Sequence, residues 1–294
     1  MRVTQGMLSH NMMRNLSNSN AKLDTYMNQV STGKKINRPS DDPVTAMKGM
    51  NYRSQVTEIQ QFQRNTNEVH NWMDNSDAAL DQATQAMQNL RELALQASND
   101  TYNADERENM QEEVEQIKEH LIDIANTNVN GKYIFNGTNT DTKPIEVNED
   151  GEIVEIDLND EAVRIEVADG TKLQANVNSG DVFNDKLFGD IDGFIDALDN
   201  NEQPTIEQSI ESMDDNINNT INARADLGAR MNRLELIENR LNDQEIVATQ
   251  TMSENEDVDY AKAITELITQ ESLHRAALSA GARIVQPTLM DFLR

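Results

Sequence analysis

Apolar residues recur at alternating spacings of three and four between Ile59 and Ala97, where ten of the twelve positions on this spacing are apolar. No Gly or Pro occurs from residue 51 to residue 130, so nothing there forces the backbone to break. A repeat of about 3.5 residues makes a narrow apolar stripe along a helix, and such a stripe needs a partner helix. We therefore expect a long helix here and a second one starting near Asn103, a suitable N-cap residue.

The same spacing returns after Pro204 and continues to Met252, which predicts another long helix. The polar run 253–257 should end that helix, and Asp257 or Asp259 can cap a last one. Near the start of the chain, leucine or valine repeats every seven residues. Neither half of the chain can cover the apolar stripe on its own helices. We therefore expect the helices of the two halves to pack against each other in antiparallel orientation.

The middle of the chain changes from helical spacing to alternation, with apolar residues at every second position in three runs, 154–158, 163–167 and 173–177. Alternation of this kind predicts strands. Asp150-Gly151 and Asp169-Gly170 lie between the apolar runs and suit tight hairpin turns. A short helix is expected at 188–198. Residues 141–215 hold 22 acidic and 4 basic residues, so most of the excess negative charge is in this insertion.

The predicted fold is mainly α with a small β insertion: long antiparallel helices from both chain ends form a coiled-coil-like bundle, beside an antiparallel β-meander. Three parts follow from these patterns. Residues 1–43 and 257–294 form terminal helical assembly segments that are flexible in the monomer. Residues 44–137 and 205–256 form the long-helix bundle, and residues 138–204 form the acidic β-rich insertion with its short helix.

Composition excludes several classes of function. The chain has 294 residues, a formal charge of −27 and no cysteine, which argues against nucleic-acid binding, disulfides, thiolate metal sites and cysteine nucleophiles. Its apolar runs are too short for a membrane helix, so no membrane partner is expected. Residues 1–30 lack the apolar core of a secretory signal, and an exported chain would need another route.

The terminal stripes allow two interpretations. A single helix with a narrow apolar stripe cannot offset about 1 to 2 kcal/mol of ordering entropy per residue by itself. The stripes could therefore order against neighbouring copies, and head-to-tail packing of this kind generates rings or tubes. They could equally pair within one chain, and composition alone does not separate the two. The candidate assembly residues are Met12, Leu16, Leu23, Val30, Ile264, Leu267, Leu278 and Ile284.

Several separated motifs resemble those of bacterial flagellins and their hook-associated relatives. Residues 30–46 read VSTGKKINRPSDDPVTA, residues 90–101 read LRELALQASNDT, and residues 224–234 read RADLGARMNRL. The opening MRVTQGM, the prolines flanking Ser-Asp-Asp, the GKYIFNG segment and the final VQPTLMDFLR are most similar to the hook–filament junction members of that family. The resemblance covers residues 1–137 and 205–294 and leaves the insertion unassigned.

The resemblance implies a structural subunit that joins the hook of the flagellum to its filament, with the terminal helices packed as an inner tube. It implies extracellular location, export through the flagellar type III channel without a cleaved signal, and an export chaperone on the C-terminal helix. The partners would be copies of this chain in a ring or tube, another junction protein, hook-side subunits and filament-side subunits. A filament flagellin is the alternative, and a secreted coiled-coil adhesin is a more distant one.

No catalytic arrangement, cofactor or metal site is expected, since the four histidines are scattered and no phosphate loop or catalytic triad is present. Residues 146–157 come nearest to a calcium loop, but Glu stands at its first position and Asp at its last, so a hairpin is preferred. The family motif is assigned a turn and a helix cap, made by Asn37, Pro39, Ser40, Asp41, Asp42 and Pro43. The insertion is taken as a solvated acidic face, with adhesion as the second interpretation.

Overall fold

The computed structural model describes residues 5–99, 104–148 and 153–285, apart from a few side chains at the edges of these ranges. The chain divides into two compact units. We call residues 1–58 with 244–294 the terminal unit and residues 59–243 the central unit. Two long helices, α2 (Pro43–Ala97) and α5 (Gln203–Glu256), contribute residues to both units.

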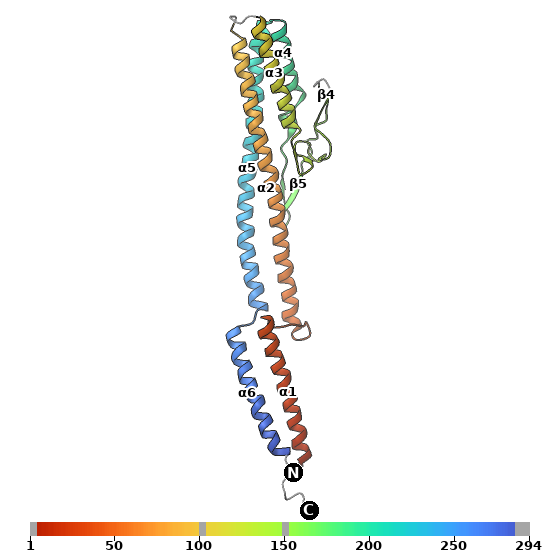
Figure 1. Cartoon of the computed structure of the whole chain (residues 1–294), viewed down its shortest axis with the longest axis vertical. Helices are drawn as coiled ribbons and strands as arrows, with labels where there is room; N and C mark the ends of the chain where they lie inside the picture. The colour runs from red at the N-terminus through yellow and green to blue at the C-terminus, as the bar shows by residue number, and fades with distance from the viewer. Residues whose placement is uncertain (1–4, 100–103, 149–152, 286–294) are drawn as a thin grey trace, which may run out of the picture. The chain divides into compact units, whose positions relative to one another are not determined.

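The terminal unit is built on a pair of antiparallel helices, α1 (Gln5–Thr32) and α6 (Tyr260–Val285), which lie side by side in Figure 1. The Gln270 side chain donates to Ser19 Oγ at 2.9 Å. Gly281 lies so close to Met12 that a Cβ on this glycine would collide with Met12 Cε. The first turns of α2 and the last turns of α5 complete the unit.

In the central unit, α2 and α5 pack antiparallel, as the spacing of their apolar residues predicted. Arg91 Nε lies 2.5 Å from Asp214 Oδ1, and Arg224 bridges Asp77 and Asp81 at 3.1 Å and 2.7 Å. The apolar stripe of α2 is buried along its length in this unit, including Met73, Leu80, Met87 and Leu90. Leu227, Leu234 and Leu241 of α5 are buried with it. The expected long-helix bundle is confirmed.

Two shorter helices, α3 (Ala104–Ala125) and α4 (Asp185–Asp199), pack against each other in the central unit. Lys118 of α3 pairs with Asp192 of α4 at 2.5 Å. The Asn184 side chain caps α4 by accepting from the backbone N–H of Leu187 at 2.9 Å. The expected cap of α3, Asn103, lies outside the described residues.

The β insertion consists of separate hairpins. The described strands pair antiparallel as β1 (Asn128–Val129) with β2 (Lys132–Tyr133), β3 (Ile145–Val147) with β4 (Ile153–Ile156), and β5 (Arg164–Ala168) with β6 (Thr171–Gln174). They form three two-stranded sheets, where the sequence suggested one meander. Leu158 and Val177, which continue the alternating pattern, lie outside the strands. Gly170 has a φ of +66° in the expected Asp-Gly turn.

Asparagine side chains provide hydrogen bonds between segments that no strand ladder joins. Buried Asn136 donates to the Thr142 carbonyl at 3.2 Å and accepts from the Asn159 N–H at 2.9 Å. Buried Asn176 accepts from the Val163 N–H at 2.8 Å. Because buried backbone groups must find partners, these amides allow short irregular segments to pack onto the helices.

Candidate functional site: the terminal assembly surface

The apolar stripes of α1 and α6 face each other but are only partly covered. Four candidate assembly residues of α1 are half-buried: Met12, Leu16, Leu23 and Val30. In α6, Leu267 is half-buried, whereas Ile264 and Leu278 are 43% and 47% exposed. Ile284 lies in the last turn of α6, and its side chain is outside the described part of the chain.

Two helices alone cannot enclose a stripe on either of them, because each helix covers only one side of its partner. In the described part of α1 and α6, Ala263 and Gly281 are the only buried residues. Large apolar side chains point to solvent on both helices, for example Met13 at 68% and Ile268 at 58% exposure. The pairing within the chain therefore leaves apolar surface that further helices could cover.

An apolar groove runs along this helix pair. Its volume is about 340 Å³, and it is lined by Ser9, Met12, Met13, Leu16, Leu278, Gly281 and Ala282. Gly281 permits the close approach of Met12, since any side chain there would collide with the methionine tip. This groove brings together three of the candidate assembly residues from opposite ends of the sequence.

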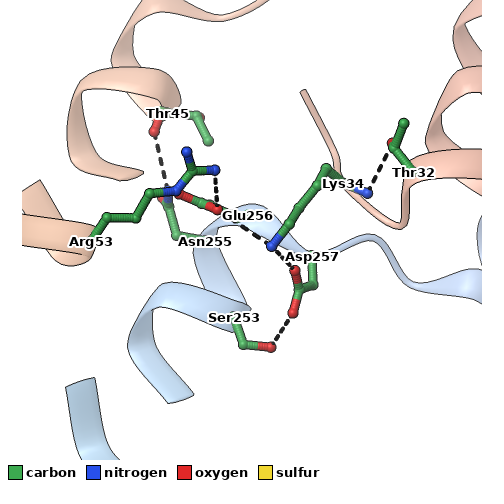
Figure 2. Close-up of polar contacts among 8 residues, drawn as sticks. All are labelled: Thr32, Lys34, Thr45, Arg53, Ser253, Asn255, Glu256 and Asp257. Atoms are coloured by element: carbon green, nitrogen blue, oxygen red, sulfur yellow. Dashed lines mark hydrogen bonds and ion pairs between the residues drawn. The ribbon is translucent and has the colours of Figure 1, made fainter. Parts of the chain in front are cut away.

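The segment that leaves α1 and the segment that enters α6 run antiparallel beside each other, and polar contacts join them (Figure 2). Lys34 and Asp257 form a single antiparallel bridge between the two segments. The Lys35 N–H donates to the Glu256 carbonyl at 2.7 Å, and the Val258 N–H donates to the Gly33 carbonyl at 2.9 Å. We call Lys34, Arg53, Glu256 and Asp257 the crossover cluster.

Charge pairing reinforces this backbone bridge. Glu256 is 4% exposed, and its Oε2 lies 2.6 Å from Arg53 Nη2 and 3.4 Å from Lys34 Nζ. Lys34 Nζ also lies 2.6 Å from Asp257 Oδ1, while Ser253 Oγ donates to the other oxygen of Asp257 at 2.6 Å. A Cβ on Gly49 would be 2.6 Å from Glu256 Oε1, so the absence of a side chain at Gly49 makes room for the buried carboxylate.

The hydrogen bonds of this cluster shift the pKa of three side chains toward their charged forms. The bond to Asp257 raises the pKa of Lys34, and the bond to Glu256 raises the pKa of Arg53. The pKa of Asp257 is lowered, first by the hydrogen bond from Lys34 and then by that from Ser253. Lys34, Arg53 and Asp257 are therefore charged over the neutral pH range.

The family motif lies beside this cluster and forms the turn that leads into α2. Asp41 Oδ2 accepts from the Arg38 N–H at 3.0 Å and more weakly from the Asn37 N–H at 3.4 Å. Asp42 Oδ1 accepts from the N–H groups of Val44 and Thr45 at 3.0 Å and 3.2 Å, so Asp42 is the N-cap of α2. The remaining motif residues are exposed and lie in the turn or the first helical position: Asn37, Pro39, Ser40 and Pro43.

The sequence pattern does not predict the crossover cluster. It offers Asp257 or Asp259 as the cap of the last helix, and Asp259 takes this position by accepting from the Lys262 N–H at 3.2 Å. Arg53 and Glu256 are separated by 203 positions in the chain. Periodicity detects neighbours on one helix, and it carries no signal for a pair this distant. The one clue was the change from apolar to polar residues where α5 ends.

Among the described residues, no group of three His, Asp or Glu side chains is arranged to hold a metal ion. Asp150 and Gly151, central to the calcium-like stretch, lie outside the described residues. In the same described part of the chain, no helix is long and apolar enough to cross a membrane.

Comparison with known proteins gives a consistent result over both ends of the chain. Residues 3–140 match the bacterial flagellin N-terminal helical region, and residues 210–293 match the bacterial flagellin C-terminal helical region. The flagellar hook-associated protein 3 of Escherichia coli is 28% identical over 95% of this chain and 96% of its own length. A flagellin of Bacillus subtilis is 25% identical over the whole of both chains.

A solved structure supports the fold. The putative flagellar hook-associated protein from Vibrio parahaemolyticus superimposes with a TM-score of 0.68 at 21% identity, over 74% of this chain and 100% of its own. The two matched helical regions lie on either side of the insertion. The chain therefore belongs to the bacterial flagellin family, whose members are structural, non-enzymatic components of the flagellum.

Proposed function

We propose that this chain is a junction subunit of the flagellum, joining hook-side subunits to filament-side subunits. The observation that carries the proposal is the partly covered apolar surface of α1 and α6, which a monomer leaves open and neighbouring subunits can cover. The identity of 28% to a hook-associated protein, against 25% to a Bacillus subtilis flagellin, favours a junction position over the filament itself.

In this proposal the subunits form a ring or tube through their terminal helices, next to another junction protein. Heterologous contacts repeat from one copy to the next and close when the rotation allows it. The acidic central unit stays in solvent, since its net charge opposes close packing of one copy against another.

The proposal places the chain outside the cell, after export through the flagellar type III channel. Before export, the exposed apolar side chains of α6 need a cover to prevent aggregation. Ile268 and Leu273 are 58% and 57% exposed in the chain by itself. An export chaperone that binds α6 would provide this cover.

The test is a truncation in cells that lack their own copy of the protein. A chain without residues 264–294 should retain a folded, soluble central unit, measured by circular dichroism, and should fail to support attached filaments, counted by electron microscopy. Normal filaments on cells that make only the truncated chain would contradict the proposal.

Point variants separate packing from export. Leu267→Glu places a charge on the half-buried stripe of α6, whereas Ser272→Glu places the same charge at an exposed position of that helix. We expect Leu267→Glu to reduce filament attachment severalfold while both variants are secreted equally.

The alternative is a filament flagellin, favoured by the 25% identity to the Bacillus subtilis flagellin over the full chain. A flagellin would assemble with itself as its main activity. Long filaments grown from the purified chain alone would support the alternative, whereas short oligomers or rings would support the junction role.

A further inference from the structure

Two exposed apolar patches lie in the terminal unit outside the α1–α6 pair. Val44, Met47 and Met50 follow one another at a spacing of three on the first turns of α2 and are 59%, 58% and 60% exposed. We call them the α2 patch. Ile246 and Val247, near the end of α5, are 66% and 63% exposed and form the α5 patch. Large apolar side chains gathered at this exposure mark surfaces that bind something.

The surroundings of the two patches carry opposite charge. Residues 34–53, around the α2 patch, contain five Lys or Arg and two Asp or Glu. Residues 245–259, around the α5 patch, contain five Asp or Glu and no Lys or Arg. Some of these charges pair within the crossover cluster, but Lys48 and Glu254 are exposed on the helices that carry the patches. Lys48 lies one turn after Val44 and Glu254 two turns after Val247, so each charge lies on the same helix face as that residue of its patch.

A groove lies next to the α2 patch and makes this part of the surface concave. It has a volume of about 110 Å³ and is lined in part by Ile36, Pro39 and Met50. Among its polar residues, Arg53 is paired with Glu256, whereas Arg38 is exposed. Methionine side chains are flexible and adapt to the surface placed against them. The α2 patch is therefore suited to an apolar partner surface with acidic edges.

A second copy of this chain offers such a surface in its own α5 patch. The terminal unit contains 12 basic and 12 acidic residues, whereas the central unit contains 13 basic and 40 acidic residues. Copies that approach through their central units repel each other, while copies that approach through their terminal units carry no net repulsion. Charge complementarity between the two patches then fixes which surfaces meet.

We propose that the α2 patch of one copy binds the α5 patch of the next copy. This contact is heterologous, so it repeats around a ring or along a tube, and it adds to the contacts made by α1 and α6. The inference rests on the proposed junction function and extends it by naming two surfaces that meet between neighbouring subunits.

Cross-linking tests the contact directly, because the natural chain contains no cysteine. Cells are made to produce a Met47→Cys chain together with a Val247→Cys chain, and their isolated flagella are treated with a short bismaleimide. The proposal predicts a cross-linked dimer that needs both variants. A Met47→Cys chain paired with a Lys172→Cys chain, whose cysteine is at an exposed position of the central unit, is the control and should give much less product.

A chain that carries both Met47→Cys and Val247→Cys distinguishes the type of contact. Head-to-tail packing predicts a ladder of cross-linked trimers and larger species, whereas a closed two-fold pair would stop at the dimer and overturn the proposal. If the variants are present in the flagella but do not cross-link, the proposed contact between the patches does not form, and the proposed junction function is unaffected. If the chain is absent from the flagella, the proposed function itself fails.

Charge variants test whether opposite charges direct the contact between the α2 patch and the α5 patch. Lys48→Glu on the Met47→Cys chain should lower the cross-linked fraction severalfold, and Glu254→Lys on the Val247→Cys chain should restore it. Lys172→Glu makes the same charge change at an exposed position of the central unit and should leave the product unchanged. An unchanged yield with Lys48→Glu would exclude a charge-directed contact.

Discussion

The apolar stripes of the long helices are buried more completely in the central unit than in the terminal unit. In the central unit α2 and α5 are joined by α3, α4 and the β insertion, and large side chains such as Leu80 and Phe194 are completely buried. In the terminal unit, α1 and α6 have only each other along most of their length, and no large side chain in their described part is buried. The comparison shows that similar stripes make a core only when enough elements surround them.

Charge follows the same division. The central unit carries the whole net charge of −27, and the terminal unit is neutral. A charged, well-packed unit is stable and soluble as a monomer, while a neutral, half-covered unit is suited to association. Each unit thus has the surface that its part in an assembly requires.

Hydrogen exchange on the purified monomer should show the largest difference between the units. We expect backbone amides of α2 near Leu80 to exchange at least about a thousandfold more slowly than those of α1 near Leu16, because opening the buried core costs more free energy. Mass spectrometry or NMR measures both in one sample. Equal protection in the two helices would mean that α1 and α6 form a closed pair by themselves, and the assembly account would lose its basis.

A matched pair of truncations compares the two cores directly. Leu80→Ala removes a fully buried side chain and should lower the free energy of unfolding of the central unit by about 2 to 5 kcal/mol. Leu267→Ala removes a half-buried side chain of α6 and should leave the central unit unchanged. Urea unfolding followed by the fluorescence of Trp72, the single tryptophan and a residue of the central unit, measures this difference. Similar losses for both variants would contradict the division into two units.

The smallest expected effect is the pH dependence of the crossover cluster. The pKa of Asp257 is lowered, so its contribution is present above about 3.8, its ordinary value, and is lost as the pH falls through the folded-state value. The pKa of Lys34 is raised, so its contribution is present below about 10.5 and is lost as the pH rises through its folded-state value. The cluster should stabilise the terminal unit between these limits.

Because both side chains of the Lys34–Asp257 pair are partly exposed, the effect should be less than about 1 kcal/mol. The protection of the Val258 amide, which donates to Gly33 in the neighbouring segment, reports it. Asp257→Asn should lower this protection at pH 7 and should differ less from the natural chain at pH 3 than at pH 7. If the protection of the Val258 amide differed equally between the two chains at both pH values, the loss would come from the changed shape of the side chain and not from its charge.

Local pattern was sufficient for the helices and their ends. The spacing from Ile59 to Ala97 depends only on which residues share one face of a helix, and the structure buries that face in the central unit. The cap formed by Asp42 depends on residues within three positions of it, and it is present as the motif suggested. In the insertion, alternation indicated strands but not their pairing, because asparagine side chains supply hydrogen bonds that a strand ladder would otherwise make.

By itself, the sequence determined the long helices, the acidic insertion between them and the family, since each depends on residues close together in the chain. Only the tertiary structure decided that Glu256 is buried between Lys34 and Arg53, and that the α1–α6 pair remains half-covered. Those features depend on which distant segments meet and on how many elements surround a stripe. Periodicity along a single chain contains no information about either.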